Sequence, residues 1–490
     1  MVIPVETIFL DAESDDTLQH KIQRLVTDAV LSGRFAAGER MPSTRMLARH
    51  LGVARNTVAL SYTELVANGY LTARGRSGYF VSADAPRLPS YDAGTPADDD
   101  AVDWAQAIAH DYTEPPKVLR PADWRDFRYP FIYGQSDASL FDHQNWRVCA
   151  VQALGKRDFG PLTHDYYEHD DPVLIEYILR QILPRRGIAA RPENILLTMG
   201  AQNALWIAAQ ILLSPDRIAV MENPGYPSLR NILASTRCRI RSVDVDAEGL
   251  PPEMIPHGAD VVFVTPSHHC PTNATMPVDR RKALLSQAEA DGFLLVEDDY
   301  EFEMAFLKSP FPALKSLDRQ GRVIYTGSFS KSLFPGLRLG YLVAPAPFIR
   351  HARSLRALTL RHTPGHIQRT AAYFLSLGHY DALIERMGRV YRKRRAVMEA
   401  AIEEHGLDMV DRSISGGSSF WIRAPASVDT SDMALKLWKE SVVIEPGHAF
   451  FAPGIDDHRH YRLAYSSIAS ERIPQGIALL AAAQRRLARH

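Results

Sequence analysis

The sequence predicts an α/β protein with a mainly parallel central sheet and a small C-terminal domain, preceded by a helical module that ends in a hairpin. Two observations indicate this fold class. From residue 128 onward, apolar runs alternate with helical stretches, and each run ends in Gly, Ser, Asp or Asn. Before residue 83, three segments with helical spacing precede a pair of short strand-like runs. With 490 residues the chain is too long for a single core.

Charge is divided unevenly along the chain, although the net value is only −1. Residues 17–82 hold nine Lys and Arg against three Asp and Glu, whereas residues 84–126 hold ten acids against four bases. A basic module followed by an acidic segment is typical of a nucleic-acid-binding head on a linker. A solvated charged surface is the alternative for either run.

The chain shows no feature of a secreted, membrane or metal-binding protein. No apolar run is long enough to cross a bilayer, and the first residues lack the basic start and apolar core of a signal peptide. Three cysteines, Cys149, Cys238 and Cys270, are far apart and lack metal-ligand spacing. We therefore expect a cytoplasmic protein with no disulfide framework, no metal and no membrane contact.

The first module has the order helix, turn, helix, hairpin. Helices are expected at 17–31, at 44–51 with Ser43 as N-cap, and at about 55–68. Leu18 and Met46 belong to the expected apolar faces of the first two helices. Gly52 and Gly69 follow the second and third helices, and residues 71–81 predict a hairpin. This order is the outline of a winged helix-turn-helix.

Residues 38–81 (starting Gly-Glu-Arg-Met-Pro-Ser-Thr-Arg-Met-Leu-Ala-Arg) are similar to the GntR-type DNA-binding domain. Such a module sets its third helix in the major groove of double-stranded DNA. The resemblance implies base reading at the start of that helix, backbone clamping by the second helix, and phosphate or minor-groove contacts by the wing. Solubilising surface arginines are the alternative. The implied DNA-binding residues are Ser43, Arg45, Arg55, Asn56, Thr57, Arg74 and Arg76.

Residues 83–126 mix Pro, Asp, Gly and Ala without a sustained period. We expect a flexible or extended linker up to about residue 100. Trp104, Tyr112 and Trp124 indicate that the later part docks on a folded surface. The predicted domains are a DNA-binding head at 15–82, an acidic linker at 83–126, and a body at 127–490.

The body is organised around one lysine. An expected strand at 322–325 runs into a loop that carries the hydroxyls of Ser328 and Ser330, the amine of Lys331 and the guanidinium of Arg338. An amine can form a Schiff base with an aldehyde cofactor, while hydroxyls and an arginine hold its phosphate. The loop resembles the cofactor-lysine motif of fold-type I pyridoxal-phosphate enzymes, S-x-x-K-x-x-x-P-G-x-R-x-G. A surface lysine in a polar turn is the alternative.

Other strand ends supply what such a lysine needs. Gly200, Ala201 and Gln202 open a helix whose backbone N–H groups suit a phosphate. Tyr226 is suited to lie flat against an aromatic cofactor ring. The expected strands of this sheet are 195–198, 217–221, 260–264, 292–296 and 322–325.

Three further residues complete the expected cofactor site. Asp298 is suited to hold a pyridine nitrogen protonated, and Tyr300 or Asn273 to hydrogen-bond the ring's phenolic oxygen. Together with Lys331 as the catalytic residue, their order along the chain resembles fold-type I aminotransferases over some 360 residues. The resemblance implies pyridoxal 5'-phosphate as cofactor.

Arg462, in Tyr-Arg-Leu-Ala-Tyr-Ser, matches the family position where an arginine clamps a substrate carboxylate. A plain structural ion pair is the alternative. The segment after Tyr166 lacks the Gly and the Leu-Arg that family members usually carry. Which tyrosine, if either, reaches the partner's cofactor therefore stays open.

A GntR-type head fused to an aminotransferase-like body resembles the MocR subfamily of bacterial transcriptional regulators. The resemblance implies a homodimer, head-to-tail and domain-swapped, that binds operator DNA and senses an amino-compound effector by aldimine exchange at Lys331. The stretch from Cys270 to Met276 favours an operon of taurine or ectoine type. One alternative is a catalytically active aminotransferase with incidental DNA binding. Another is a body that has lost its cofactor and only dimerises the heads.

Overall fold

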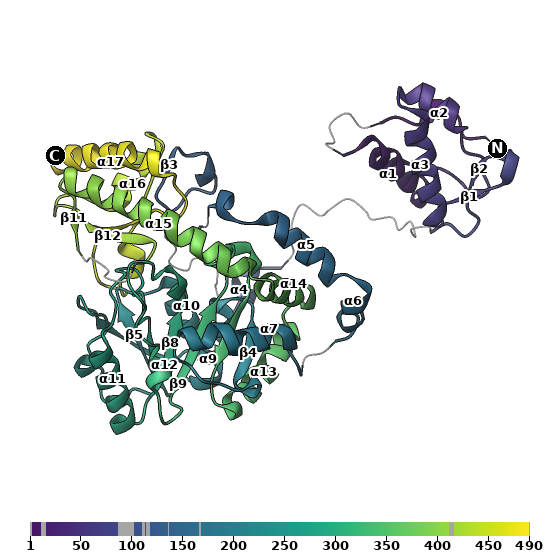
Figure 1. Cartoon of the computed structure of the whole chain (residues 1–490). Helices are drawn as coiled ribbons and strands as arrows, with labels where there is room; N and C mark the ends of the chain where they lie inside the picture. The colour runs from purple at the N-terminus through teal and green to yellow at the C-terminus, as the bar shows by residue number, and fades with distance from the viewer. Residues whose placement is uncertain are drawn as a thin grey trace. The chain divides into compact units, whose positions relative to one another are not determined.

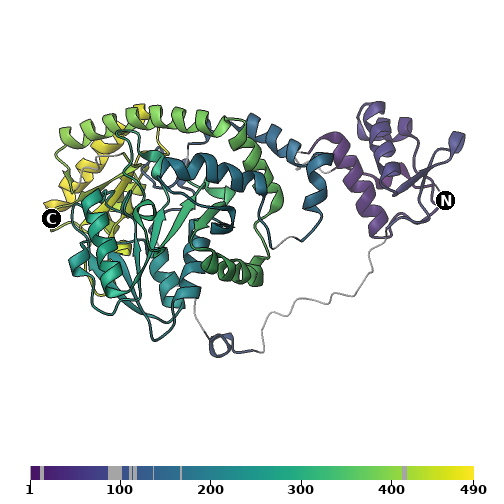
Figure 2. The ribbon, with the colours of Figure 1, turned by 60° about the horizontal axis from the view of Figure 1, so that its bottom comes forward.

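The computed structural model describes residues 2–10, 16–86, 102–109, 113, 118–135, 137–165, 168–410 and 416–489. The chain divides into two compact units, Met1–His110 and Asp111–His490 (Figures 1 and 2), and each unit has its own buried core.

The first unit contains three helices followed by two antiparallel strands in which Leu71 pairs with Val81. The side chain of Ser43 accepts a hydrogen bond from the backbone N–H of Met46, which confirms it as the N-cap of the second helix. Gly52 has a φ of 67°, so it makes the left-handed turn that ends this helix. The elements are α1 (Leu18–Leu31), α2 (Thr44–Leu51), α3 (Arg55–Ala67), β1 (Leu71–Ala73), β2 (Tyr79–Val81) and α4 (Trp104–Ala107).

Three apolar side chains expected to be covered are exposed. Leu18 is 47% exposed at the first position of α1, and Met46 is 44% exposed because the short helix α2 buries only Leu47 and Ala48. Trp104 is 54% exposed, whereas Trp124 is buried in the second unit. Tyr112 and residues 87–101 of the expected linker lie outside the described residues.

The second unit is built on a seven-stranded sheet in the order β4-β10-β9-β8-β7-β5-β6. Neighbouring strands from β9 to β6 run parallel, and only β10 pairs antiparallel, with β4 and β9. The expected α/β class with a mainly parallel sheet is confirmed. The strands are β4 (Ile195–Thr198), β5 (Ile218–Asn223), β6 (Arg239–Asp244), β7 (Val261–Val264), β8 (Leu294–Asp299), β9 (Val323–Ser328) and β10 (Gly340–Val343).

Helices cover both faces of this sheet, as Figure 1 shows. Successive residues of β7 point to opposite faces: Val261 and Phe263 pack with α9, α10 and α13, while Val262 and Val264 pack with α11 and α12. The strands are therefore apolar throughout, and their polar ends gather at one edge. The helices are α9 (Ala201–Leu212), α10 (Pro227–Ser235), α11 (Val278–Asp291), α12 (Leu314–Leu317) and α13 (Ala346–Leu360).

A smaller C-terminal domain carries an antiparallel sheet in the order β11-β12-β15-β14 and a separate parallel pair, β3 with β13. Within the described part of the chain, no helix combines the length and the apolar character that a membrane span requires. The strands are β3 (Tyr129–Pro130), β11 (Asp408–Met409), β12 (Ser419–Arg423), β13 (Val442–Val443), β14 (Glu445–Pro446) and β15 (His460–Ala464). The remaining helices are α5 (His143–Ala153), α6 (Lys156–Leu162), α7 (Pro172–Tyr177), α8 (Leu183–Arg185), α14 (Gly365–Ser376), α15 (His379–Glu404), α16 (Thr430–Trp438) and α17 (Ile473–Ala488).

Candidate cofactor and effector site

A polar cradle surrounds Gly200, at the point where β4 turns into α9. A Cβ atom on Gly200 would lie 3.3 Å from Nη2 of Arg338 and 3.5 Å from Oγ of Ser330. That Oγ atom is buried and has no hydrogen-bond partner among the described residues. Ala201 and Gln202 form the first turn of α9, which no described side chain caps. Backbone N–H groups, a hydroxyl without a partner and a guanidinium together fit a phosphate group.

Two interactions hold this cradle in shape. The backbone N–H of Ser330 donates to Oγ of Ser328 at 3.1 Å, and Nη2 of Arg338 donates to the carbonyl of Met199 at 3.2 Å. Arg338 has a φ of 51°, a backbone conformation that side-chain-bearing residues rarely adopt. The fold thus brings Gly200, at the start of α9, next to Ser330 and Arg338 of the lysine loop, as expected for a phosphate site.

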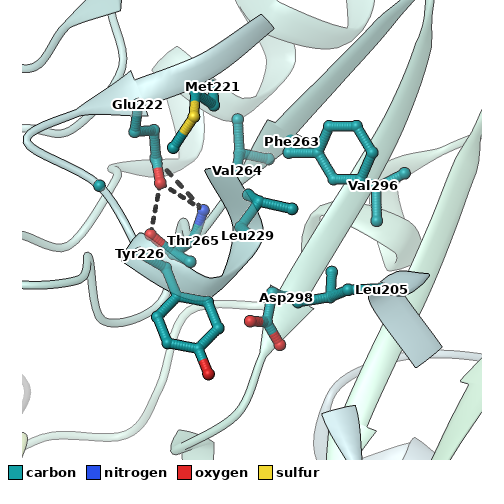
Figure 3. Close-up of a pocket in the computed structure, with 11 residues that line it drawn as sticks. Leu205, Met221, Glu222, Tyr226, Leu229, Phe263, Val264, Thr265, Val296 and Asp298 are labelled. Atoms are coloured by element: carbon teal, nitrogen blue, oxygen red, sulfur yellow. Dashed lines mark hydrogen bonds between the residues drawn. The ribbon is translucent and has the colours of Figure 1, made fainter. Parts of the chain in front are cut away.

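A buried carboxylate lies at the end of β8, beside a cavity (Figure 3). Oδ1 of Asp298 accepts a hydrogen bond from Oγ1 of Thr326 at 2.9 Å. Asp298 and Tyr226 line the same cavity, so Tyr226 offers an aromatic face beside the carboxylate. Burial raises the pKa of Asp298 to about 7, and the charge of Lys331 partly opposes this rise. A buried carboxylate of this kind fits a cationic ring nitrogen.

Glu222, on the wall of the same cavity, was not expected from the sequence. It accepts hydrogen bonds from the backbone N–H of Thr265 at 3.1 Å and from Oγ1 of Thr265 at 2.6 Å (Figure 3). Burial raises the pKa of Glu222 to about 7. Its position directly before Asn-Pro-Gly-Tyr, at the end of β5, is the sequence signal that marks it.

Lys331 lies against the segment that follows β3. Its Nζ atom is 4.5 Å from the ring centroid of Tyr133, and a Cβ atom on Gly134 would be 2.1 Å from that nitrogen. A side chain at position 134 would displace the amine from this place, and Gly134 also has a φ of 72°, which favours glycine. Burial lowers the pKa of Lys331, although the nearby Glu301 carboxylate acts in the opposite direction. A lowered pKa favours the neutral, nucleophilic amine.

Tyr133 and Glu301 are two further site residues that the sequence did not indicate. The hydroxyl of Tyr133 donates to Oε2 of Glu301 at 3.0 Å, and the hydroxyl of Ser418 donates to Oε1. Burial raises the pKa of Glu301, while these donors and Lys331 lower it. Glu301 directly follows Tyr300 and lies three residues after Asp298. This acidic residue beside two expected site residues could have marked it in the sequence. Nothing local in the sequence marks Tyr133.

Arg462 is buried between two rings. Its Cζ atom lies 4.0 Å from the ring centroid of Tyr133 and 4.8 Å from that of Phe450. Nε donates to Oε2 of Glu445 at 2.9 Å, and Nη1 is 4.0 Å from Sγ of Cys270. Burial disfavours the charged guanidinium, but Glu445 outweighs this and raises the pKa of Arg462. Arg462 thus forms a buried ion pair with Glu445 through Nε, while Nη1 of its guanidinium faces Cys270.

The two side chains expected at a ring oxygen bond to the protein backbone. The hydroxyl of Tyr300 donates to the carbonyl of His268 at 2.8 Å. Nδ2 of Asn273 donates to the carbonyl of Ser419 at 2.7 Å, which joins the large sheet's loop to β12 of the smaller domain. Tyr166 and Tyr167, the tyrosines considered for a contact with a partner subunit, lie outside the described residues.

In the first unit, the residues expected to contact DNA lie mostly on the surface. Arg55 and Asn56 are exposed at the first two positions of α3, and Thr57 is half-buried. Arg45 is exposed on α2, where Ser43 is engaged as N-cap. On the wing, Arg76 is exposed in the turn between β1 and β2, and Arg74 is exposed with its Cζ atom 4.6 Å from the ring centroid of Phe80.

Comparisons with known proteins match both units. The family model described as bacterial regulatory proteins, gntR family, matches residues 18–81, and the model of aminotransferase class I and II matches residues 140–477. The HTH-type transcriptional regulator TauR of Rhodobacter capsulatus is 59% identical over 485 residues, covering 99% of this chain and 100% of TauR. The probable rhizopine catabolism regulatory protein MocR of Rhizobium meliloti is 31% identical over 418 residues, covering 82% of this chain and 80% of MocR.

A solved structure extends the comparison to the body. Kynurenine aminotransferase of Pyrococcus horikoshii, crystallised with PMP, superposes with a TM-score of 0.68 and 27% identity, covering 75% of this chain and 95% of the enzyme. A winged helix-turn-helix head joined to an aminotransferase-type body defines an HTH-type transcriptional regulator. The chain belongs to the MocR-type subfamily of GntR regulators.

Proposed function

We propose that this regulator carries pyridoxal 5'-phosphate on Lys331 and senses an amino compound there, which changes the binding of its head to operator DNA. The observation that carries the proposal is the cradle at Gly200, where the buried Oγ of Ser330 lacks a partner among the described residues. Such a hydroxyl is costly unless a ligand satisfies it. The match to aminotransferases supports the same cofactor.

Different residues around Lys331 would hold different parts of the pyridoxal phosphate. Ser330, Arg338 and the N-terminus of α9 would hold the phosphate, and Asp298 would pair with the ring nitrogen. When bound, the cofactor supplies an aldehyde carbon that condenses with a primary amine. Burial keeps the pKa of Lys331 low, so that this amine is readily neutral and exchangeable.

The effector we propose is an amine that also carries a carboxylate or sulfonate. Arg462 is the anchor for the acid group, because its guanidinium edge opposite Glu445 faces the site near Cys270. An acid anchor at a fixed distance from Lys331 would select among the many amines that could react there. Taurine and ectoine-derived amino acids both fit this chemistry, and the 59% identity to TauR favours a taurine operon.

For the head, we propose that Arg55, Asn56 and Thr57 read bases while Arg45, Arg74 and Arg76 contact the backbone. The exposure of Arg55 and Asn56 at the start of α3 supports this assignment. A homodimer with two heads would bind paired half-sites.

The test is a titration of the full-length protein with taurine, followed by cofactor absorbance and by operator binding. Wild type should respond in both, whereas Lys331→Ala should lose the borohydride-reducible cofactor and the response but still bind operator. A Lys331→Ala protein that retained a reducible cofactor adduct would refute the assignment.

A second candidate function is slow transamination. Desolvation lowers the pKa of Lys331, and the charge of Lys331 acts on the Asp298 carboxyl. This arrangement suits a working aminotransferase, and the solved relative is such an enzyme. Steady turnover of an amino donor with an oxo acid would favour this candidate over sensing alone.

A further inference from the structure

The chain reaches its body through residues 118–135, here called the exit segment, because every residue of the head precedes it in sequence. The exit segment is attached to the smaller domain by a series of backbone hydrogen bonds. The N–H groups of Tyr129 and Phe131 donate to the carbonyls of Ser441 and Val443, each at 2.9 Å. The hydroxyl of Ser467 donates to the carbonyl of Pro130 at 3.1 Å.

One end of the exit segment contacts both proposed effector anchors. The ring of Tyr133 lies 4.5 Å from Nζ of Lys331 and 4.0 Å from Cζ of Arg462. The backbone N–H of Tyr133 donates to Oε2 of Glu445 at 3.2 Å, the same oxygen that accepts from Arg462. Its hydroxyl donates to Glu301, on the loop after β8. The ring of Tyr133 therefore borders both groups that the proposed effector would contact.

The other end of the exit segment returns to the same site. Val118 packs in an apolar cluster with Cys270, Trp421 and Phe450. Cys270 and Phe450 are also the neighbours of the Arg462 guanidinium. Between the two ends, Trp124 is buried against Ile132 and Val443. Both ends and the middle of the exit segment are thus held by the site or by the smaller domain.

We propose that the exit segment transmits effector occupancy to the head, with Tyr133 as the residue that detects it. This inference rests on the proposed function, since it names how the same site is regulated. An effector changes an equilibrium only through contacts that differ between two arrangements. Tyr133 provides such contacts, because an acid bound at Arg462 and an amine at Lys331 change both of its cationic neighbours at once. A displaced ring would move the backbone of the exit segment, which follows the linker and the head in sequence.

The experiment compares full-length wild type, Tyr133→Ala and Tyr133→Phe, using taurine as the probe. Because Tyr133 lines the site, Tyr133→Ala should need more taurine to change the cofactor absorbance. At taurine concentrations that saturate this absorbance change, we expect its operator affinity to change less than about twofold; allosteric responses are typically about 5- to 150-fold. Tyr133→Phe keeps the ring and loses the hydroxyl that bonds to Glu301, so it should retain part of the response. Tyr177→Phe is the matched control, because it removes a hydroxyl bond to Asp381 far along the chain and should behave as wild type.

A second measurement does not depend on the effector. Amide hydrogen exchange without taurine should become faster in Tyr133→Ala along the whole of residues 118–135, and stay unchanged in Tyr177→Phe. Faster exchange confined to residues 131–135, or a wild-type operator response in Tyr133→Ala, would overturn the inference. If taurine moves neither readout in wild type, the proposed effector is wrong, and the exchange pattern alone decides the role of the exit segment. If Tyr133→Ala does not fold, Tyr133→Phe decides: full wild-type response and exchange would overturn the inference.

Discussion

Nε of Arg462 donates a hydrogen bond to Oε2 of Glu445 at 2.9 Å, and both side chains are buried. The proposed acid anchor therefore already has a counter-charge inside the protein. An effector's acid group would share Arg462 with Glu445, so its binding energy is smaller than for an unpaired arginine. This pairing favours a reversible sensor whose response depends on effector concentration.

Ser330→Ala should separate cofactor binding from folding. Because Oγ of Ser330 is buried and has no partner among the described residues, its loss should not lower the free energy of unfolding of the cofactor-free protein and should raise it by up to about 1–3 kcal/mol. A hydrogen bond to a phosphate contributes about 1.5–3 kcal/mol, so affinity for pyridoxal phosphate should fall about tenfold or more. Denaturant unfolding measures the free energy of unfolding, and fluorescence titration measures the affinity for pyridoxal phosphate.

Ser328→Ala is the matched control for this prediction. Oγ of Ser328 accepts a hydrogen bond from the backbone N–H of Ser330. Its loss leaves a buried N–H without a partner and should cost about 1–3 kcal/mol of stability even without cofactor. Equal stability losses in the two variants would mean that Ser330 has a structural partner.

Asp298 should make the stability of the cofactor-free protein depend on pH. Burial raises its pKa from 3.8 to about 7, so the folded state binds this proton more tightly than the unfolded state. The resulting loss of stability develops as pH rises from about 4 to about 7 and is complete above pH 7. We expect Asp298→Asn to raise the melting temperature by several degrees at pH 8 and by less at pH 5, while weakening cofactor binding. An Asn variant that melts below wild type at pH 8 would contradict the raised pKa.

Two substitutions in the head should distinguish contacts to bases from contacts to phosphates. Arg55→Ala should weaken operator binding by about 1–3 kcal/mol and relax sequence preference, since Arg55 lies exposed at the start of α3. Arg76→Ala should weaken binding to all sequences alike. It should also reduce the slope of log affinity against log salt concentration by about 1, because one phosphate contact is lost. Binding measured on operator and on scrambled DNA at several salt concentrations tests both. Unchanged operator affinity in Arg55→Ala would exclude α3 as the recognition helix.

Most of the fold follows from local patterns in the sequence. The expected strands at 195–198, 217–221, 260–264, 292–296 and 322–325 correspond to β4, β5, β7, β8 and β9. Ser43 at a helix start and Gly52 at its end have local physical causes, capping and a left-handed turn, and both were predicted. The sequence did not indicate β6, because this edge strand is mostly exposed and lacks the continuous apolar run of the other strands. The four residues of β10 were not separated from the lysine loop that precedes them.

The candidate site was predictable where its residues sit at strand ends and not where they arrive from elsewhere. Ser330 and Lys331 closely follow β9, and Asp298 is the second-last residue of β8, so their convergence at one edge of the sheet could be foreseen. Tyr133 lies 168 residues before Glu301, and no local pattern links them. The pairing of Arg462 with Glu445 likewise arises from the register of β14 against β15.

The last prediction concerns Arg462 and Glu445 together. Removing Arg462 alone leaves the buried Glu445 carboxylate without its counter-charge, which typically lowers the free energy of unfolding by about 3–5 kcal/mol. A lost response in that variant would therefore not distinguish loss of effector binding from loss of folding. Glu445→Gln removes the competing charge, while its amide oxygen can still accept the bond from the N–H of Tyr133. We therefore expect Glu445→Gln to lower the taurine concentration needed for half response.

The double variant Arg462→Met with Glu445→Gln should regain most of the stability that Arg462→Ala loses, because no charge remains buried without a partner. It should keep the cofactor absorbance and the basal operator affinity, since neither side chain belongs to the phosphate cradle or to the head. Its taurine midpoint should rise at least tenfold, because the acid group has lost its guanidinium. Thermal unfolding and taurine titrations of wild type, Glu445→Gln and the double variant measure these effects. A double variant that is stable and responds at the wild-type midpoint would place the acid-binding group elsewhere in the site.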